Sequence, residues 1–359
     1  MEIPKLRVVQ WSTGGCGAIA VRVMAERDDL DLVGVWVHTA DKVGRDAGEL
    51  AGHGPIGVTA TSDVDELLAL APDCVSYTAS GEVRGPECIA DFCTFLRAGI
   101  NVVSTSVPGL VHPAAYDVAA VEAIEAAAAE GGASLYISGI EPGFAADHLV
   151  LVLSTLSNRI ETVRTQEIFG YQDYPVAFTL NEVFGFGKPA DHQALMEIPG
   201  VQASAWAPPV RMVADRLGVD VAIREAYEKR ITGRDLETAI GIIPAGTVGA
   251  VRFETIGVVD GRDAIVIEHV NRMAPDLAPD WPSARRDGTY RLLVEGDPSY
   301  QCELTLGGPD DFSHHGMVAT TMRIVNAIPH VCAARPGIVT SVDLPLTLPY
   351  RPFRSGAAM

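Results

Sequence analysis

A glycine cluster near the N-terminus has the residue types and spacing of a phosphate-binding turn. The apolar run from Leu6 to Trp11 predicts a strand, and the small residues Ala18 and Ala20 lead into a predicted helix. Between them the chain reads G-x-G-x-x-A from Gly15 and G-x-x-G-x-x-A from Gly14, spacings typical of dinucleotide-binding turns. Glycine lets backbone N–H groups approach a pyrophosphate at the positive end of the helix. The expected contacts are Ser12, Thr13, Gly14, Gly15, Cys16 and Gly17. A glycine-rich turn without a ligand is the alternative.

The end of the second predicted strand, Leu32 to Val37, bears on which dinucleotide binds. Proteins that bind NAD usually carry a carboxylate at this point, where it holds the ribose hydroxyls. In this chain His38, Thr39 and Lys42 follow the strand and offer donors for a 2′-phosphate. The sequence therefore favours NADP over NAD. Asp41 keeps NAD open, and solvated loop residues are the other interpretation of these side chains.

Small and polar residues follow the later strands, where an open parallel sheet binds its ligands. The cofactor contacts expected there are Thr78, Ala79, Ser80, Ser104, Thr105 and Gly143. Glu141 follows the predicted strand Leu135 to Ser138 and would lie near the nicotinamide ring. A carboxylate there either orients the carboxamide or exchanges a proton with the substrate, which makes Glu141 the candidate catalytic residue. A salt-bridged or helix-capping glutamate is the alternative.

Aromatic residues are frequent in the second half of the chain. Tyr171, Tyr174 and Phe178 follow the predicted strand Val163 to Phe169 and are candidates to line a substrate pocket, although aromatic clusters more often form plain core. We expect no metal site. His314-His315 does not predict one, because adjacent helical residues do not share a face and no further ligands lie at metal spacing.

The elements that must position these residues change character along the chain. Strands alternate with helices up to Gly143, which indicates an α/β fold with a doubly wound parallel sheet. Longer alternating segments follow, and Asp260-Gly261 has the sequence of a hairpin turn. His269 lies in one of these strands and is expected to be a packed residue of the core or of a sheet face. Helices are predicted from Ala145 to Leu156 and from Met317 to Ile328.

Three regions follow from this change. We expect a dinucleotide-binding Rossmann domain over residues 1–142. A substrate-binding α+β domain with a largely antiparallel sheet is expected over residues 143–315. A C-terminal helix and tail over residues 316–359 is expected to pack back onto the Rossmann domain.

Length and charge exclude several classes of partner. The chain has 359 residues, which suits two domains better than one. Its formal charge is −19, from 27 basic and 46 acidic residues, and this disfavours nucleic acid and anionic membranes. No apolar run approaches the ~20 residues of a membrane span, and the N-terminus lacks the pattern of a signal peptide. The six cysteines form no C-x-x-C pair, so we expect reduced thiols in a cytoplasmic protein.

The chain resembles the dihydrodipicolinate-reductase-like superfamily, and more closely its 2,4-diaminopentanoate dehydrogenase and native amine dehydrogenase branch. The resemblance is carried by VVQWSTGGCG, WVHTADKVGRDAGEL, GINVVSTS, SGIEPGF, FGFGKP and HHGMVATTMRIVNAIPHVCAARPGI. It implies a homodimer formed through the sheet of the second domain. It also implies hydride transfer between NAD(P)H and a carbon that bears an amine, imine or ketone.

One departure from this branch concerns its proton chemistry. Its amine dehydrogenases carry a glutamate, which binds ammonia, shortly after the strand that matches Asn101 to Ser106. This chain has Thr105-Ser106-Val107-Pro108 at that place, without an acid. We therefore expect an NADP-preferring oxidoreductase of a small carbonyl, imine or amine, with Glu141 as a candidate substitute. The alternative is a cofactor-binding sensor without efficient turnover.

Overall fold

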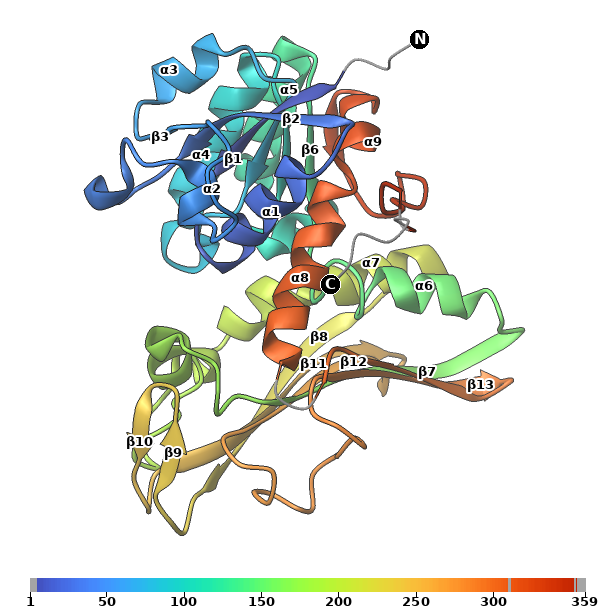
Figure 1. The fold of residues 1–359 in the computed structure, drawn as a ribbon. Helices are drawn as coiled ribbons and strands as arrows, with labels where there is room; N and C mark the ends of the chain where they lie inside the picture. Colours follow the sequence, from blue (N-terminus) through green and yellow to red (C-terminus); the bar gives the residue numbers. More distant parts are fainter. Residues whose placement is uncertain (1–4, 309–310, 352, 354–359) are drawn as a thin grey trace. The chain divides into compact units, whose positions relative to one another are not determined.

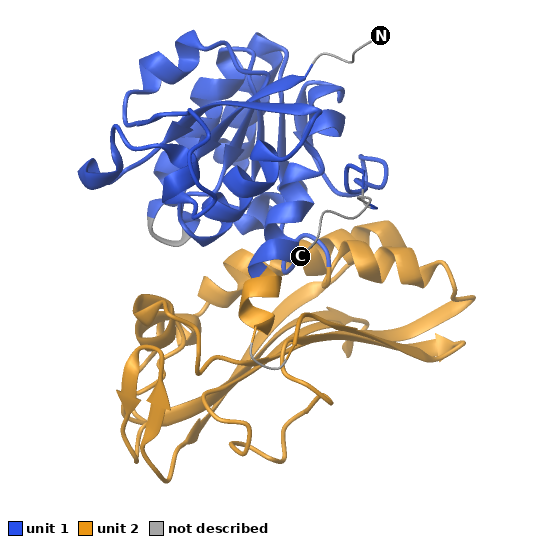
Figure 2. Cartoon of the chain, viewed as in Figure 1, with its two compact units in different colours: residues 1–144, 317–359 blue, residues 145–316 orange. Residues whose placement is uncertain are grey.

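The computed structural model describes residues 5–308, 311–351 and 353 (Figure 1). They form two compact units (Figure 2). The first unit comprises residues 1–144 and 317–359, and the second comprises residues 145–316. The C-terminal segment therefore belongs to the same unit as the N-terminal one.

The first unit is built on a parallel sheet. Within the described residues it has seven strands in the order β15-β6-β5-β4-β1-β2-β3, and every neighbouring pair is parallel. The central strands are continuous apolar runs because both faces of such a sheet are covered. The bounds are β1 (Leu6–Trp11), β2 (Leu30–Trp36), β3 (Ala60–Thr61), β4 (Cys74–Tyr77), β5 (Asn101–Ser104), β6 (Ser134–Ile137) and β15 (Gly337–Val339).

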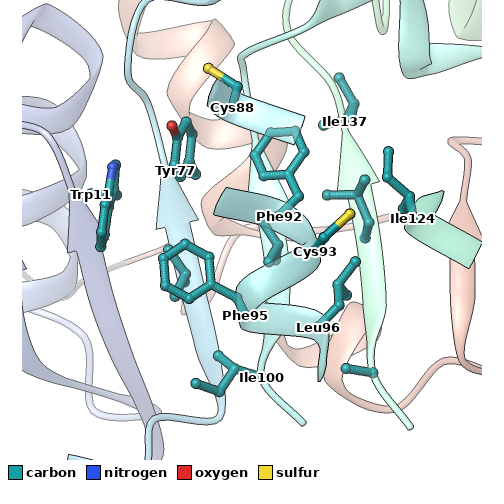
Figure 3. Close-up of a cluster of buried hydrophobic side chains, with 14 of the residues drawn as sticks. Trp11, Tyr77, Cys88, Phe92, Cys93, Phe95, Leu96, Ile100, Ile124 and Ile137 are labelled. Carbon is teal, nitrogen blue, oxygen red and sulfur yellow. The ribbon is translucent and has the colours of Figure 1, made fainter. Parts of the chain in front are cut away.

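Helices cover both faces of this sheet. Successive side chains of a strand point to opposite faces, so Trp11 joins the cluster in Figure 3 with Phe92 and Ile124, whereas Val8 packs with Met24 and Ile324 on the other side. The helices of this unit are α1 (Gly15–Ala25), α2 (Ala47–Leu50), α3 (Val64–Ala69), α4 (Gly81–Arg97), α5 (Val118–Gly131), part of α8 (Phe312–Val325) and α9 (Ile328–Cys332). Short 3-10 helices are η1 (Ala40–Lys42), η2 (Pro108–Val111) and η3 (Pro113–Ala115). The doubly wound α/β prediction is confirmed.

The C-terminal region differs from its prediction in two respects. The predicted helix from Met317 to Ile328 is instead α8, which ends at Val325, followed by α9, which begins at Ile328. Pro329 explains the break, since proline lacks an N–H donor and clashes with the preceding turn but is tolerated in the first turn of a new helix. The tail also contributes β15, an unpredicted strand in which Ile338 pairs with Leu135 of β6.

The second unit is built on a mixed sheet in the order β14-β13-β7-β12-β11-β8 within the described residues. Only the pair of β7 and β12 is parallel among the pairs described, so the largely antiparallel prediction is confirmed. Asp260 and Gly261 have φ of 50° and 77° and close the predicted hairpin. The bounds are β7 (Arg159–Gly170), β8 (Ala222–Ile231), β9 (Leu236–Thr238), β10 (Gly241–Ile243), β11 (Val248–Val259), β12 (Arg262–Arg272), β13 (Thr289–Asp297) and β14 (Tyr300–Thr305).

Helices pack on one face of this second sheet. Val150 and Val210 contact the buried strand residues Ile265 and Ile267. The helix predicted from Ala145 to Leu156 is shorter, because Asp147 accepts a hydrogen bond from the His148 N–H and serves as the N-cap. The helical segments are α6 (His148–Ser154), α7 (Val201–Leu217), the π-helical turn η4 (Thr179–Val183) and the 3-10 turn η5 (Leu195–Glu197).

Candidate functional site

The strand order of the first unit indicates where along the sheet a ligand would bind. The chain winds from β1 to β2 and β3 on one side and to β4, β5 and β6 on the other, so β1 and β4 are the neighbours at which the winding reverses. Open α/β sheets bind ligands at the carboxyl ends of such strands. The residues after β1 and β4 include Thr13, Gly14 and Thr78, all of which are among the predicted cofactor contacts.

The glycine turn itself leaves room for an anion. Gly14 and Gly15 are exposed, and a Cβ on Gly14 would meet no atom within 4 Å. No side chain caps the N-terminus of α1, and its first turn, which the structure describes completely, has no acidic residue. The first N–H groups of α1 are therefore available to a phosphate at the positive end of the helix. By contrast, a Cβ on Gly17 would lie 2.1 Å from the Ser12 carbonyl oxygen, so the helix and the strand end are in direct contact there.

A buried glutamine supports the glycine turn through hydrogen bonds of its side chain. Gln10 is fully buried, and its side-chain amide donates to the Ser12 carbonyl (3.0 Å) and to Thr78 Oγ1 (2.8 Å). Ser12 has a φ of 80°, a left-handed conformation that is uncommon for a residue with a side chain. The Gln10 hydrogen bonds hold the turn in this conformation and tie the ends of β1 and β4 together.

Lys42 lies against the glycine turn. Its Nζ donates to Thr13 Oγ1 at 3.1 Å, which places the charge of η1 beside the loop after β1. His38 and Thr39 are exposed just after β2, and the alternative carboxylate Asp41 is exposed as well. The structure thus brings Lys42 to the turn, while His38 and Thr39 remain open to solvent.

The residues after β4 and β5 are bound to one another. Ser106 Oγ donates to the Ala79 carbonyl, and the buried hydroxyl of Ser104 accepts from the Ser106 N–H at 2.9 Å. Ser80 is exposed and is the N-cap of α4, whereas Thr105 is half-buried. Ser104 is therefore engaged in holding the loop, and Thr78, Ser80 and Thr105 retain some exposure.

The loop after β6 carries Glu141, which is half-buried, and the buried Gly143. Residues of α8 hold this loop: Thr320 Oγ1 accepts from the Ile140 N–H at 3.3 Å, and Arg323 donates to the Gly143 carbonyl at 3.4 Å. Arg323 also lies over the Phe144 ring, 5.1 Å from its centroid. The sequence does not mark these supporting residues, because only tertiary folding brings α8 to the end of β6.

The three predicted pocket residues of the second unit are not equivalent. The rings of Tyr171 and Tyr174 are in contact, with centroids 5.4 Å apart, and Tyr171 also contacts Phe184. Phe178 is 45% exposed. The structure thus unites Tyr171 and Tyr174 in an aromatic cluster and leaves Phe178 exposed outside it.

The second unit also contains a partly buried carboxylate that is not among the predicted site residues. Glu167 of β7 is half-buried, and Tyr171 donates its hydroxyl hydrogen bond to Glu167 Oε1 at 3.2 Å. Burial raises the pKa of the Glu167 carboxyl to about 7, although hydrogen bonds from Tyr290 and Tyr171 act in the opposite direction. A signal was present in the sequence: Glu167 occupies the same face of the strand as Val163, which is a core position.

Three further properties of the described residues bear on function. No group of three or more His, Cys, Asp or Glu side chains in the described part of the chain is arranged to hold a metal ion. No helix among those residues is long and apolar enough to cross a membrane. All six cysteines lie among the described residues and carry free thiols.

The parallel sheet, the open glycine turn and the strand-end side chains define a protein with a Rossmann-type dinucleotide-binding unit. The family model for the 2,4-diaminopentanoate dehydrogenase C-terminal domain matches residues 144–351. An amine dehydrogenase of Streptomyces virginiae is 38% identical over 349 residues, covering 95% of this chain and 96% of that protein. The chain therefore belongs to the 2,4-diaminopentanoate dehydrogenase and amine dehydrogenase family, which confirms the resemblance seen in its sequence.

Solved structures share this fold. The structure of amine dehydrogenase from Mycobacterium smegmatis matches with a TM-score of 0.75 and 21% identity, covering 98% of this chain and 99% of that one. GenD2 from gentamicin A biosynthesis, solved in complex with NAD, matches with a TM-score of 0.53 and 16% identity, covering 91% and 87%. At these identities the matches establish the architecture.

Proposed function

We propose that the chain is an NADP-preferring amine dehydrogenase for a small, mostly apolar amine and the matching ketone or aldehyde. Membership of this family supports an amine as the substrate. The position of Lys42 beside the glycine turn, 3.1 Å from Thr13 Oγ1, carries the cofactor preference. When bound, the cofactor supplies or accepts the hydride, and the protein binds its phosphates and positions the substrate.

The residues of the first unit fit such a cofactor. The exposed Gly14 and Gly15 admit the pyrophosphate to the N-terminus of α1. Lys42, with His38 and Thr39 nearby in the chain, offers donors to a 2′-phosphate. Glu141, at the end of β6, is proposed to act on the nicotinamide side, where its carboxylate orients the carboxamide or exchanges a proton.

Cofactor preference is tested with the double variant His38→Ala/Lys42→Ala. Removing charged donors to a phosphate weakens binding by about 1.5–3 kcal/mol, so the dissociation constant for NADPH should rise roughly 10- to 100-fold. NADH lacks the 2′-phosphate and should bind nearly as before. Lys5→Ala, which removes an exposed lysine elsewhere, is the matched control. An equal loss for both cofactors would contradict the 2′-phosphate assignment.

The reaction is tested by following the oxidation of NADPH and NADH with a panel of small ketones and aldehydes, with and without ammonium. Ammonium-dependent oxidation is the expected result. Oxidation that ignores ammonium would identify a carbonyl reductase instead. Cofactor binding without any turnover would support the sensor alternative, which the missing acid after Ser104 favours.

A further inference from the structure

The segment between β2 and β3 of the first unit carries Lys42. β2 ends at Trp36 and β3 begins at Ala60, and between them lie η1, which contains Lys42, and α2, which has only four residues. Gly54 and Gly57 adopt φ of 97° and 79° in this segment. Glycine loses more conformational freedom on folding than any other residue. A segment of this kind therefore needs contacts from side chains to keep one conformation.

The carboxylate of Asp46 accepts hydrogen bonds from backbone N–H groups at both ends of this segment. Its Oδ1 accepts from the Gly48 N–H (2.8 Å) and the Glu49 N–H (3.2 Å), which makes Asp46 the N-cap of α2. The same carboxylate accepts from the Ile56 N–H (3.1 Å) and the Gly57 N–H (2.8 Å). Although burial acts to raise the pKa of this carboxyl, the four N–H groups together hold it below its ordinary value. One ionised side chain thus joins the two ends of the loop 46–57.

Asp63 shows what an ordinary helix cap does in the same unit. Its Oδ1 accepts from the Asp65 N–H (2.9 Å) and the Glu66 N–H (3.2 Å) at the start of α3. These two hydrogen bonds match the two that Asp46 makes to α2 in kind and in length. The bonds of Asp46 to the far end of its loop have no counterpart at Asp63 in the described part of the chain. We infer that these additional bonds stabilise the loop rather than the helix.

The residues just before Asp46 are hydrogen-bonded to the start of β3. The Gly44 N–H donates to the Ala60 carbonyl, and the Ala60 N–H donates to the Arg45 carbonyl, both at 2.8 Å. Since β3 is the edge strand of the parallel sheet, these bonds fix the backbone that follows Lys42 against the sheet.

The helix that Asp46 caps is fixed in turn to α1, which begins in the glycine turn. Arg22 of α1 donates to the Ala51 carbonyl at the C-terminus of α2, at 2.7 Å. Ala47 and Ala51 are buried in the same apolar cluster as Met24, so α2 packs beside α1 (Figure 1). The capping carboxylate therefore connects the loop of Lys42 to the helix of the glycine turn.

We propose that Asp46 is a positioning residue that sets the preference for NADP by holding Lys42 at the glycine turn. This inference deepens the proposed function and rests on its assignment of Lys42 to the 2′-phosphate. Lysine carries its charge on a flexible four-carbon stem, so the Lys42 Nζ stays beside Thr13 only if its backbone is fixed. Ordering such a side chain in advance lowers the entropy cost of binding. Asp46 acts through Lys42, because a carboxylate would repel the phosphate itself.

The test measures the dissociation constants of NADPH and NADH by calorimetry on the full chain and its variants. Asp46→Ala should raise the dissociation constant of NADPH roughly 2- to 10-fold, the cost of ordering one flexible side chain. The value for NADH should change little, since NADH has no 2′-phosphate. Asp46→Asn keeps one acceptor oxygen and should give a smaller effect in the same direction. Asp63→Ala, the matched control, removes the equivalent cap of α3 and should leave the ratio of the two constants at its wild-type value.

A double-mutant cycle separates positioning of Lys42 from a general loss of structure. In a Lys42→Ala background the chain has no lysine to displace, so adding Asp46→Ala should leave the affinity for NADPH almost unchanged. A purely structural Asp46 would weaken NADPH binding equally in both backgrounds and would weaken NADH binding as well. Amide hydrogen exchange over residues 39–45 provides a second measurement, and it should become faster in Asp46→Ala and stay at the wild-type rate in Asp63→Ala.

The outcomes separate this inference from the proposed function. A wild type that prefers NADPH, together with Asp46 variants that keep the full preference, would overturn the inference and leave the proposed cofactor in place. Losses of NADPH affinity that add up independently in the cycle would also overturn it. A wild type that binds both cofactors equally would reject the proposed preference and this inference together. None of these measurements depends on turnover, so the proposed amine substrate is tested separately.

Discussion

Gly17 has no room for a side chain, because its Cβ would lie 2.1 Å from the Ser12 carbonyl oxygen and 2.9 Å from Thr78 Oγ1. Gly14, three residues earlier, faces open space. The two glycines of the same turn therefore have different structural roles. Gly17 permits contact between α1 and the end of β1, and Gly14 keeps the approach to the helix N-terminus clear.

This difference predicts opposite behaviour of two alanine variants. Gly17→Ala should lower the free energy of unfolding by about 1–3 kcal/mol, as expected for overpacking against backbone. Gly14→Ala should change it by no more than about 0.5 kcal/mol. Urea unfolding of both variants measures this directly. Similar losses in the two variants would show that the contact with Ser12 relaxes freely.

At the level of elements, two paired residues of the second sheet, Glu167 of β7 and His269 of β12, make the free energy of unfolding depend on pH in opposite directions. His269 binds its proton more weakly in the folded protein, so between about pH 3 and its ordinary 6.5 the unfolded chain holds more protons, and the His269 contribution to stability rises with pH. Glu167 has a raised pKa, so from its ordinary 4.5 to about 7 its contribution falls as pH rises. Between about pH 4.5 and 6.5, where both ranges overlap, the two contributions to stability therefore change with pH in opposite directions.

Single variants should reveal how the contribution of each residue to stability changes with pH. The stability difference between wild type and His269→Leu should increase with pH between about 4.5 and 6.5, by at most ~1.4 kcal/mol per unit. The difference between wild type and Glu167→Gln should decrease over the same window. Urea unfolding at several pH values provides the measurement, and the exposed His53→Leu is the control. If the stability difference from wild type changed with pH in the same direction for both variants, the two groups would not titrate as their burial requires.

For the whole molecule, one face of the second unit's sheet is covered by none of the described helices of that unit (Figure 2). That face carries the Arg164, Arg252 and Glu268 ion pairs, and a loop whose Trp281 packs on Ile168. Together with family membership, it supports the proposal of a homodimer formed through this sheet. Light scattering at micromolar concentration should give twice the mass of one chain. A monomeric mass would contradict the proposal.

The sequence by itself determined the local features. The glycine spacing after an apolar strand, the Asp260-Gly261 hairpin and the alternation of strands and helices depend on neighbouring residues, and the structure contains each of them. The predicted helix boundaries were less accurate where a single residue changed the point at which a helix begins or ends. Pro329 ended the predicted C-terminal helix early, and Asp147 delayed the start of α6.

Only the tertiary structure decided which distant residues meet. Lys42 reaches Thr13 because β1 and β2 are adjacent, and β15 joins the sheet only because the C-terminal segment returns to β6. The carboxyl of Glu167 depends on strand register for its neighbours His269 and Tyr290. Its burial and its lack of a partner cation among the described residues, which set its chemistry, are properties of packing. Pairing between strands far apart in the chain leaves no local pattern, so the sequence marked the binding turn but not this carboxylate.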